Sequence, residues 1–328
     1  MSQYGAMISG TGSCVPEHRL TNADLSKMVD TNDEWITQRT GIKERRIAQE
    51  GQTTATLATE AARNAIANAG LTPADIGLIV CGTITPEMTF PSTACFIAKE
   101  LGLSDAPAFD LQAACSGFLY AMDTASQFVM SGRYQHVLAI GAETLSRITD
   151  YTDRGSCILF GDGAGAVVLS RTQDPERGLI YSSLHADGNG WNMLYCPPGS
   201  RHPISQKMID SRGQYMKLSG RDVYKFAVNR FAELIQDAMT KCNLLPEQVA
   251  MIVPHQVNQR IIDSAIERIG FPMERVYVNI EQMGNTSSAS IPIALDEVWR
   301  SGRLKRGDAI IMVAFGAGLT WANAVVRI

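Results

Sequence analysis

Long hydrophobic runs, an excess of basic residues and a secretory signal are all missing from this sequence. The longest apolar stretch, AIIMVAFGAGL from Ala309, is shorter than the about 18 residues that a membrane-spanning helix needs. The N-terminal MSQYGAMISGTGSCVP has no basic segment before an apolar one, so it does not predict a signal peptide. The 29 Lys and Arg residues are outnumbered by 33 Asp and Glu residues, which argues against a nucleic-acid-binding protein.

Paired cysteine motifs are missing as well. The 7 cysteines include no C-x-x-C pair, so the sequence predicts neither a disulfide framework nor a zinc site. We therefore expect a reduced, cytoplasmic protein that holds no metal or cofactor and associates with neither a membrane nor nucleic acid. A chain of 328 residues with 45% apolar residues is large enough for two core-bearing units.

Helical and strand patterns alternate along the chain, which predicts an α/β fold. Buried strands are expected at 76–83, 106–112 and 136–143, and helices at 54–69 and 115–132. A further long helix is expected to open at Ser219, where Ser219 and Asp222 have the spacing of a capping box.

The two halves of the sequence resemble each other. SGR recurs 170 residues apart, at Ser131 and Ser301, and AIGAE at Ala139 is followed 175 residues later by AFGAG at Ala314. LIV at Leu78 likewise precedes MIV at Met251 by 173 residues. Short matches also arise by chance in α/β chains, but their common order favours a duplicated unit with a pseudo-two-fold axis. An offset of 170 places Cys115 opposite Asn285, so we expect turns from both halves to meet at one site.

Cys115 is the strongest candidate for a nucleophile. In AACSGF it stands between small residues where a strand is expected to become a helix, and the positive end of a helix favours a thiolate. The commoner role of a cysteine is that of an inert apolar residue. We assign that role to the cysteines in apolar strand or helix patterns: Cys81, Cys95, Cys157 and Cys242.

His255 and Asn285 are the candidate partners of the nucleophile. His255 in VPHQVNQR follows a strand, and Asn285 in MGNTSSAS lies in a glycine-preceded turn, where an Asn often serves only the turn itself. Cys, His and Asn together permit hydrolysis, as in papain-like proteases, or acyl transfer followed by carbon–carbon bond formation. The motif of a papain-type cysteine is absent. An Asn that faced the substrate would join the His as a second neutral donor to a thioester carbonyl.

The sequence resembles the β-ketoacyl-(acyl carrier protein) synthase III family along essentially its whole length. The resemblance rests on DEWITQRTGIKER, TFPSTAC, AFDLQAACSGF, DRGSCILFGDGAGAVVL, VPHQVNQRI, MGNTSSAS and AFGAGLTWA. It implies an α/β thiolase-like fold of two duplicated halves, 1–174 and 175–328, layered α-β-α-β-α about a pseudo-two-fold axis.

The resemblance also implies a decarboxylative condensation that initiates fatty acid synthesis. Cys115 is expected to take the acyl group from acyl-CoA. His255 and Asn285 would then bind the malonyl thioester carbonyl of malonyl-acyl carrier protein as carbon dioxide leaves. The backbone N–H groups of Cys115 and Ala317 are expected to form the oxyanion hole.

The same resemblance implies three further groups of site residues. The CoA site is expected to comprise Trp35, Arg39, Arg154, Gly220 and Asn258. The acyl pocket is expected to contain Phe315 and, from the partner subunit of a homodimer, Phe90. Acyl carrier protein is expected to dock on Lys225, Arg260 and Arg268, although ordinary solvated surface is the alternative role for each basic side chain.

Some positions depart from the family pattern or leave rival functions open. Ala317 stands where many members have glycine, and the roles of Glu87, Met88 and Arg221 leave the acyl preference open. A condensing enzyme of secondary metabolism with another acceptor is the main alternative. A thioesterase and a non-catalytic subunit are the others, the latter disfavoured because Cys115, His255 and Asn285 are all present.

Overall fold

The core of the computed structural model consists of two β-sheets, and the structure describes residues 4–174 and 176–328. The first sheet has the order β1-β7-β6-β4-β5. Its strands are β1 (Gly5–Cys14), β7 (Asp162–Thr172), β6 (His136–Thr144), β4 (Leu78–Gly82) and β5 (Ala108–Leu111). The second sheet has the order β11-β12-β13-β8. Its strands are β11 (Val249–Pro254), β12 (Ala309–Gly316), β13 (Thr320–Arg327) and β8 (Gly178–Ala186).

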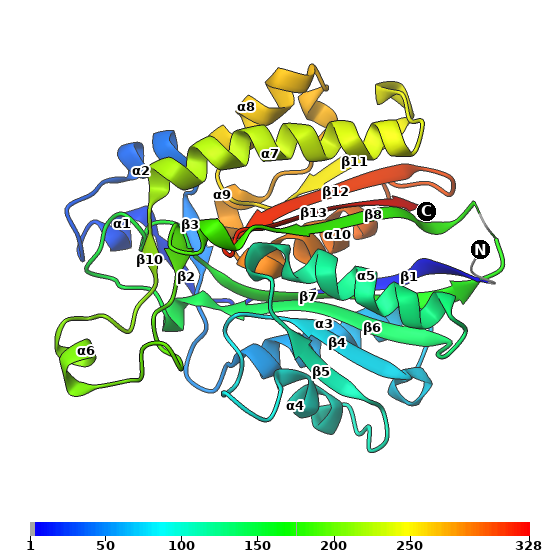
Figure 1. The fold of residues 1–328 in the computed structure, drawn as a ribbon, viewed down its shortest axis with the longest axis horizontal. Coiled ribbons are helices and arrows are strands. Elements are labelled where there is room, and N and C mark those ends of the chain that lie inside the picture. The colour runs from blue at the N-terminus through cyan, green and yellow to red at the C-terminus, as the bar shows by residue number, and fades with distance from the viewer. Residues whose placement is uncertain (1–3, 175) are drawn as a thin grey trace.

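Helices cover both sheets and fill the space between them (Figure 1). The layer between the sheets contains α5 (Gly117–Met130) and α10 (Ser290–Arg300). Outside the first sheet lie α3 (Thr54–Asn68) and α4 (Thr93–Glu100), and outside the second lie α7 (Gly220–Lys241) and α8 (Gln259–Ile269). This is the α-β-α-β-α layering that the resemblance predicted.

Shorter elements surround these layers. They are β2 (Arg19–Thr21), β3 (Glu44–Arg46), β9 (Leu194–Tyr195), β10 (Lys217–Leu218), α1 (Asn22–Leu25), α2 (Asp33–Thr40), α6 (Gln206–Asp210) and α9 (Ile280–Met283). The segment with α6 extends from the body beside β10 (Figure 1). No helix in the described ranges has both the length and the apolar character needed to cross a membrane.

The two sheets share one topology, which agrees with the duplication inferred from the sequence. In each sheet a parallel pair (β4–β6, β11–β12) is followed by two antiparallel neighbours (β7 and β1, β13 and β8). An isolated parallel bridge between Ile252 and Val276 occupies the place that β5 has in the first sheet. The predicted division between residues 174 and 175 falls in the link from β7 to β8, and these bounds stay a prediction.

The pairing of Cys115 with Asn285 was wrong by three positions. Each inner helix follows a 3₁₀ turn, Ala114–Ser116 before α5 and Ser287–Ala289 before α10. The first residues of these turns, Ala114 and Ser287, share an unusual positive φ of 46° and 49°. Cys115 therefore corresponds to Ser288. The SGR offset fails here because α5 has 14 residues and α10 has 11.

The expected helix starts are present, with one difference in capping. Thr53 caps α3 by accepting a hydrogen bond from the Thr56 backbone N–H, in a capping box. The long helix α7 does begin directly after Ser219, but no side-chain capping bond forms there. The Ser219 hydroxyl instead donates to the Asp222 carboxylate, at 2.6 Å.

The interior consists of three apolar clusters that match the layers. One lies between the sheets around α5 and α10, one packs α3 and α4 on the first sheet, and one packs α7 and α8 on the second. The parallel strands β4 and β12 are buried along their whole length, as expected for strands covered on both faces. Their carboxyl ends lead into loops, where α/β proteins commonly bind ligands.

Candidate active site

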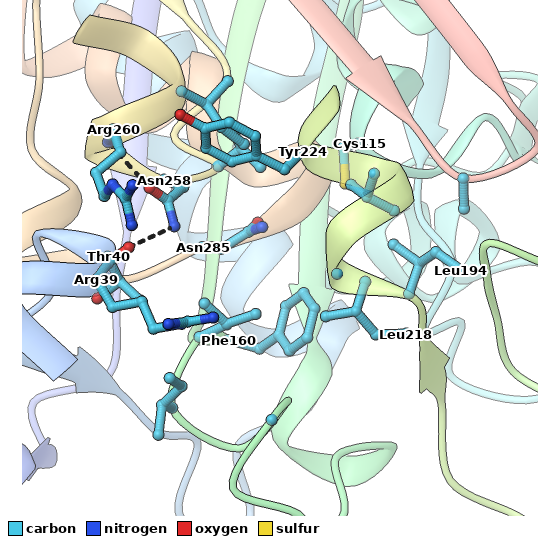
Figure 2. Close-up of a pocket in the computed structure, with 18 of the residues that line it drawn as sticks. Arg39, Thr40, Cys115, Phe160, Leu194, Leu218, Tyr224, Asn258, Arg260 and Asn285 are labelled. Carbon is cyan, nitrogen blue, oxygen red and sulfur yellow. Dashed lines mark hydrogen bonds between the residues drawn. The ribbon is translucent and has the colours of Figure 1, made fainter. Parts of the chain in front are cut away.

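One cavity of about 660 Å³ collects the predicted catalytic residues (Figure 2). Cys115, His255 and Asn285 all line it, although they come from three separate segments of the chain. Trp35, Arg39 and Arg154 line the same cavity. The cavity therefore joins the residues predicted for chemistry to those predicted for CoA binding.

Cys115 is held where a turn of one half of the chain packs closely against the other half. It lies in the 3₁₀ turn before α5 and is 7% exposed. The backbone at Gly316, at the end of β12, packs against this turn, so that a Cβ at position 316 would lie 2.6 Å from the Cys115 backbone nitrogen. Glycine at 316 thus permits the contact that fixes Cys115 beside the AFGAG turn.

The thiol of Cys115 is more deeply shielded than the sequence suggested. Burial raises the pKa of this thiol to about 12, and the nearby Glu143 carboxyl contributes in the same direction. Burial therefore acts against the effect expected of the helix start, which stays a prediction. The Ser287 hydroxyl opposes the effect of burial. Hydrogen bonding at the site thus lowers the pKa of the thiol, against the effect of burial.

His255 follows β11 and presents one ring nitrogen to the cavity. Its backbone N–H donates to Val313 O at 2.8 Å, and its Nδ1 is 2.7 Å from the Ser290 hydroxyl oxygen. Its Nε2 is buried and has no hydrogen-bond partner among the described residues. Burial lowers the pKa of His255 to about 3, so the imidazole is neutral near pH 7. The edge-on ring of Phe315 packs beside it, with centroids 6.1 Å apart.

Asn285 is fixed by its own turn. Its Oδ1 accepts the Ser287 backbone N–H at 2.9 Å. Its backbone bonds to Leu159 O and to the Gly161 N–H, at 2.9 Å and 3.0 Å. Because Oδ1 is occupied, the amide nitrogen is the end left to meet a ligand. Asn285 and His255 can therefore offer two neutral donors at one cavity.

The predicted CoA residues lie together at another part of the cavity. The guanidinium carbons of Arg39 and Arg154 lie 5.3 Å and 5.2 Å from the centre of the Trp35 ring. Asn258 caps α8 by accepting the Arg260 backbone N–H, and its amide donates to Arg39 O at 3.1 Å (Figure 2). Gly220, the first residue of α7, also lines the cavity. A flat cationic and aromatic surface of this kind suits a nucleotide base.

Only some of the remaining predicted site residues line the cavity. Phe315, Ala317 and Arg260 line the cavity. Phe90 does not line it and is 82% exposed. Arg268 lies outside the cavity lining and contacts Asn229 through a hydrogen bond. The side chain of Lys225 lies outside the described residues, as does that of Arg221.

Sequence reasoning missed several residues around the site. Apolar side chains that narrow the cavity come from the segment around β9 and β10 and from the turn after β12, namely Leu194, Leu218 and Leu319. Ser287 and Ser290 stand in the quoted MGNTSSAS motif, whose serines were not considered individually. No cluster of at least three His, Cys, Asp or Glu side chains suited to a metal ion occurs among the described residues.

Comparison with known proteins agrees with this geometry. The family "3-Oxoacyl-[acyl-carrier-protein (ACP)] synthase III" matches residues 109–188, and its C-terminal counterpart matches residues 239–328. The beta-ketoacyl-[acyl-carrier-protein] synthase III of Caldanaerobacter subterraneus subsp. tengcongensis is 50% identical, over 99% of this chain and 98% of its own. The chain belongs to the β-ketoacyl-(acyl carrier protein) synthase III family. As such it is an acyl-transferring condensing enzyme of fatty acid biosynthesis.

Solved structures give the same result for the fold. The 3-oxoacyl-[acyl-carrier-protein] synthase III of Aquifex aeolicus superimposes with a TM-score of 0.92 at 45% identity, over 99% of this chain and 100% of its own. The priming β-ketosynthase of the R1128 polyketide biosynthetic pathway has a TM-score of 0.92 at 35% identity, over 100% of this chain and 97% of its own. The fold is thus that of synthase III enzymes, and it is shared with a priming β-ketosynthase of a polyketide pathway.

Proposed function

We propose that Cys115 is the nucleophile that receives the acyl group of an acyl-CoA. The Cys115 sulfur attacks the thioester carbonyl and the bond from that carbonyl to the CoA sulfur breaks. CoA leaves as a thiol with the proton that the Cys115 thiol gives up. The backbone N–H groups of Cys115 and Ala317 are the proposed donors to the oxyanion. The single cavity shared by Cys115, His255, Asn285 and the Trp35 surface is the observation that carries this proposal.

In the second half-reaction, His255 and Asn285 donate hydrogen bonds to the carbonyl oxygen of a malonyl thioester. Carbon dioxide leaves, the enolate carbon attacks the acyl group on Cys115, and the carbon–sulfur bond to Cys115 breaks. The unpartnered His255 Nε2 and the available Asn285 amide nitrogen support these roles. Both groups are neutral, so they stabilise developing negative charge without binding the malonyl carboxylate as a salt bridge.

The proposed partners are acyl-CoA, malonyl-loaded acyl carrier protein and a second copy of the chain. Trp35 and Arg154 are assigned to the adenine, Arg39 to the CoA phosphates, and Gly220 and Asn258 to the walls of the entrance. Lys225, Arg260 and Arg268 are assigned to the carrier protein. The carrier protein named for the curated relatives supports this assignment, as does the position of Arg260 at the cavity.

Separate assays of the two half-reactions test the proposal. Asn285→Ala should still form the acyl-enzyme with acyl-CoA, detected by intact mass, because the malonyl carbonyl is the only reacting group to which Asn285 is assigned. Condensation with malonyl-acyl carrier protein should fall about a hundred- to a thousand-fold, the usual cost of losing one such donor. His255→Ala should show the same loss of condensation with some slowing of acylation.

Cys115→Ser is the matched control for acylation. This variant should accumulate no acyl-enzyme over the time in which the wild type is fully acylated, because an alcohol lacks thiolate character. Equal loss of both half-reactions in a folded Asn285→Ala would contradict the proposed division of roles. Release of free acid in place of a 3-oxoacyl thioester would indicate a thioesterase.

A further inference from the structure

The segment Ser287–Ser290 brings several serine hydroxyls to the catalytic site, and one of them has no structural partner. Ser288 donates toward Gly82 O and the Glu143 carboxyl, at 2.9 Å and 2.8 Å. The Ser290 hydroxyl contacts His255 Nδ1. Ser287 is 1% exposed, and its Oγ makes no well-formed hydrogen bond with any described residue. A buried hydroxyl without a hydrogen-bond partner is destabilising, so its placement requires a reason.

The backbone at Ser287 is also held in an unfavourable conformation. Its φ of +49° lies in the left-handed region, which is uncommon for residues other than glycine and asparagine. The bond from its backbone N–H to Asn285 Oδ1 ties this conformation to a catalytic residue. Such strain is concentrated at functional sites, where the surrounding structure maintains it.

The Ser287 hydroxyl is buried in a turn that lies against the turn of the reactive sulfur. The 3₁₀ turn of Ser287 packs directly on the turn that carries Cys115. A Cβ at Gly117 would lie only 3.2 Å from the Ser288 Cβ, which shows how closely the turns approach. Of the contributions that lower the pKa of the Cys115 thiol, that of the Ser287 side chain is the largest.

The burial of Cys115 and the neighbouring groups Glu143 and His255 do not stabilise a Cys115 thiolate. The thiol is buried, and the carboxyl of Glu143 contributes against its ionisation. His255 is neutral and supplies no positive charge. A hydroxyl donor at the sulfur is therefore a direct means of stabilising a buried thiolate, because hydrogen bonds to charged groups are stronger than neutral ones.

We propose that Ser287 is a further catalytic residue whose hydroxyl donates a hydrogen bond to the Cys115 thiolate. Ser287 keeps its proton throughout. The thiol proton passes to the departing CoA sulfur as the Cys115 sulfur attacks the acyl-CoA. The same hydrogen bond forms again when the carbon–sulfur bond breaks at condensation and the thiolate leaves. This role rests on the proposed function of Cys115 as nucleophile.

The pH dependence of alkylation tests the proposal. Iodoacetamide labelling of Cys115 is followed by peptide mass spectrometry, since Cys95 and Cys196 are exposed and are also labelled. In Ser287→Ala the midpoint of the rate profile should rise by about one pH unit, and acylation at pH 7 should slow about tenfold. Ser287→Gly, which accepts the positive φ without strain, should show the same rise and separates loss of the hydroxyl from misfolding.

Ser288→Ala is the matched control, because it removes a neighbouring buried hydroxyl that faces Gly82 and Glu143. Its midpoint should not rise. Unchanged midpoints in both Ser287 variants, or an equal rise in Ser288→Ala, would overturn the proposal. If the wild type were acylated at a residue other than Cys115, the proposed nucleophile itself would be wrong.

Discussion

At the scale of single residues, Glu143 is a buried acid whose charge the fold controls. Its Oε2 accepts hydrogen bonds from the Thr85 backbone and hydroxyl at 3.1 Å and 2.5 Å, and its Oε1 contacts Ser288. Burial raises the pKa of Glu143 from its usual 4.5 to about 7. A protonated Oε1 can donate to the Ser288 hydroxyl, which then donates to Gly82 O. The neutral form therefore satisfies every polar group in this cluster.

Because the pKa of Glu143 is higher in the folded state than in the unfolded state, Glu143 stabilises the folded protein at low pH. This contribution decreases as the pH rises. The contribution is complete below about pH 4.5 and is lost as pH rises through about 7. Glu143→Gln mimics the neutral acid, so it should unfold with a free energy about 3 kcal/mol above wild type at pH 8. The difference should vanish near pH 4. Urea unfolding of both proteins across this range measures it, and a pH-independent difference would mean that Glu143 is charged throughout.

The site residues that could be predicted from the sequence are those whose neighbouring residues form a recognisable motif. Cys115 and His255 stand in turns that follow strands, and Asn285 stands in a glycine-preceded turn after α9. The shared cavity accords with their selection as a set. Glu143 and Ser287 gave no such signal. The properties of Glu143 and Ser287 come from burial and from contacts with residues distant in sequence. Both burial and these contacts are set by how the two halves of the chain pack together.

At the scale of elements, the structure explains why the AIGAE and AFGAG repeats each contain a glycine. Gly141 in β6 faces the turn before α10, where a Cβ would lie 2.3 Å from Ser288 O. Gly316 in β12 faces the turn before α5 in the same way. Each half therefore supplies the glycine that admits the other half's turn. The unequal lengths of α5 and α10 are what the short SGR match could not reveal.

Gly316→Ala should displace the turn of Cys115. The new Cβ would meet the Cys115 backbone nitrogen at 2.6 Å, and the backbone cannot give way as a flexible side chain could. We expect a loss of about 1–3 kcal/mol in unfolding free energy, together with slower acyl-enzyme formation. Gly199→Ala, where a Cβ has no neighbour within 4 Å, is the control and should change neither. Wild-type acylation in Gly316→Ala would show that the turn adapts.

At the scale of the whole molecule, one face carries apolar side chains that the single chain leaves uncovered. Phe90 is 82% exposed and Met88 is 47% exposed, both in the segment between β4 and α4. Exposed apolar groups of this size commonly mark an interface. The proposed homodimer would bury Phe90 against the acyl pocket of the partner subunit.

Mixing two inactive or altered variants tests that arrangement. Phe90→Ala should widen the accepted range of acyl chains, and Cys115→Ala should form no acyl-enzyme. In a mixed dimer, the Cys115→Ala subunit would supply Phe90 to the intact Cys115 of its partner. Exchange of subunits should therefore restore wild-type chain preference in the acylated fraction, measured by intact mass. If the acyl-chain preference of the mixed dimer stayed the same as that of Phe90→Ala alone, Phe90 would lie outside the partner's acyl pocket.

The pairing of β1 with β7 has a consequence for how the chain is made. Gly5 lies opposite Thr172, so the start of the first strand has no antiparallel partner until 167 further residues have been added. At about 5–20 residues per second this interval lasts roughly 8–33 s on a ribosome. Contacts so far apart in sequence also make folding slow. The N-terminal strand must therefore remain unpaired through half of synthesis, which makes nascent chains ending before β7 the natural substrates of a chaperone.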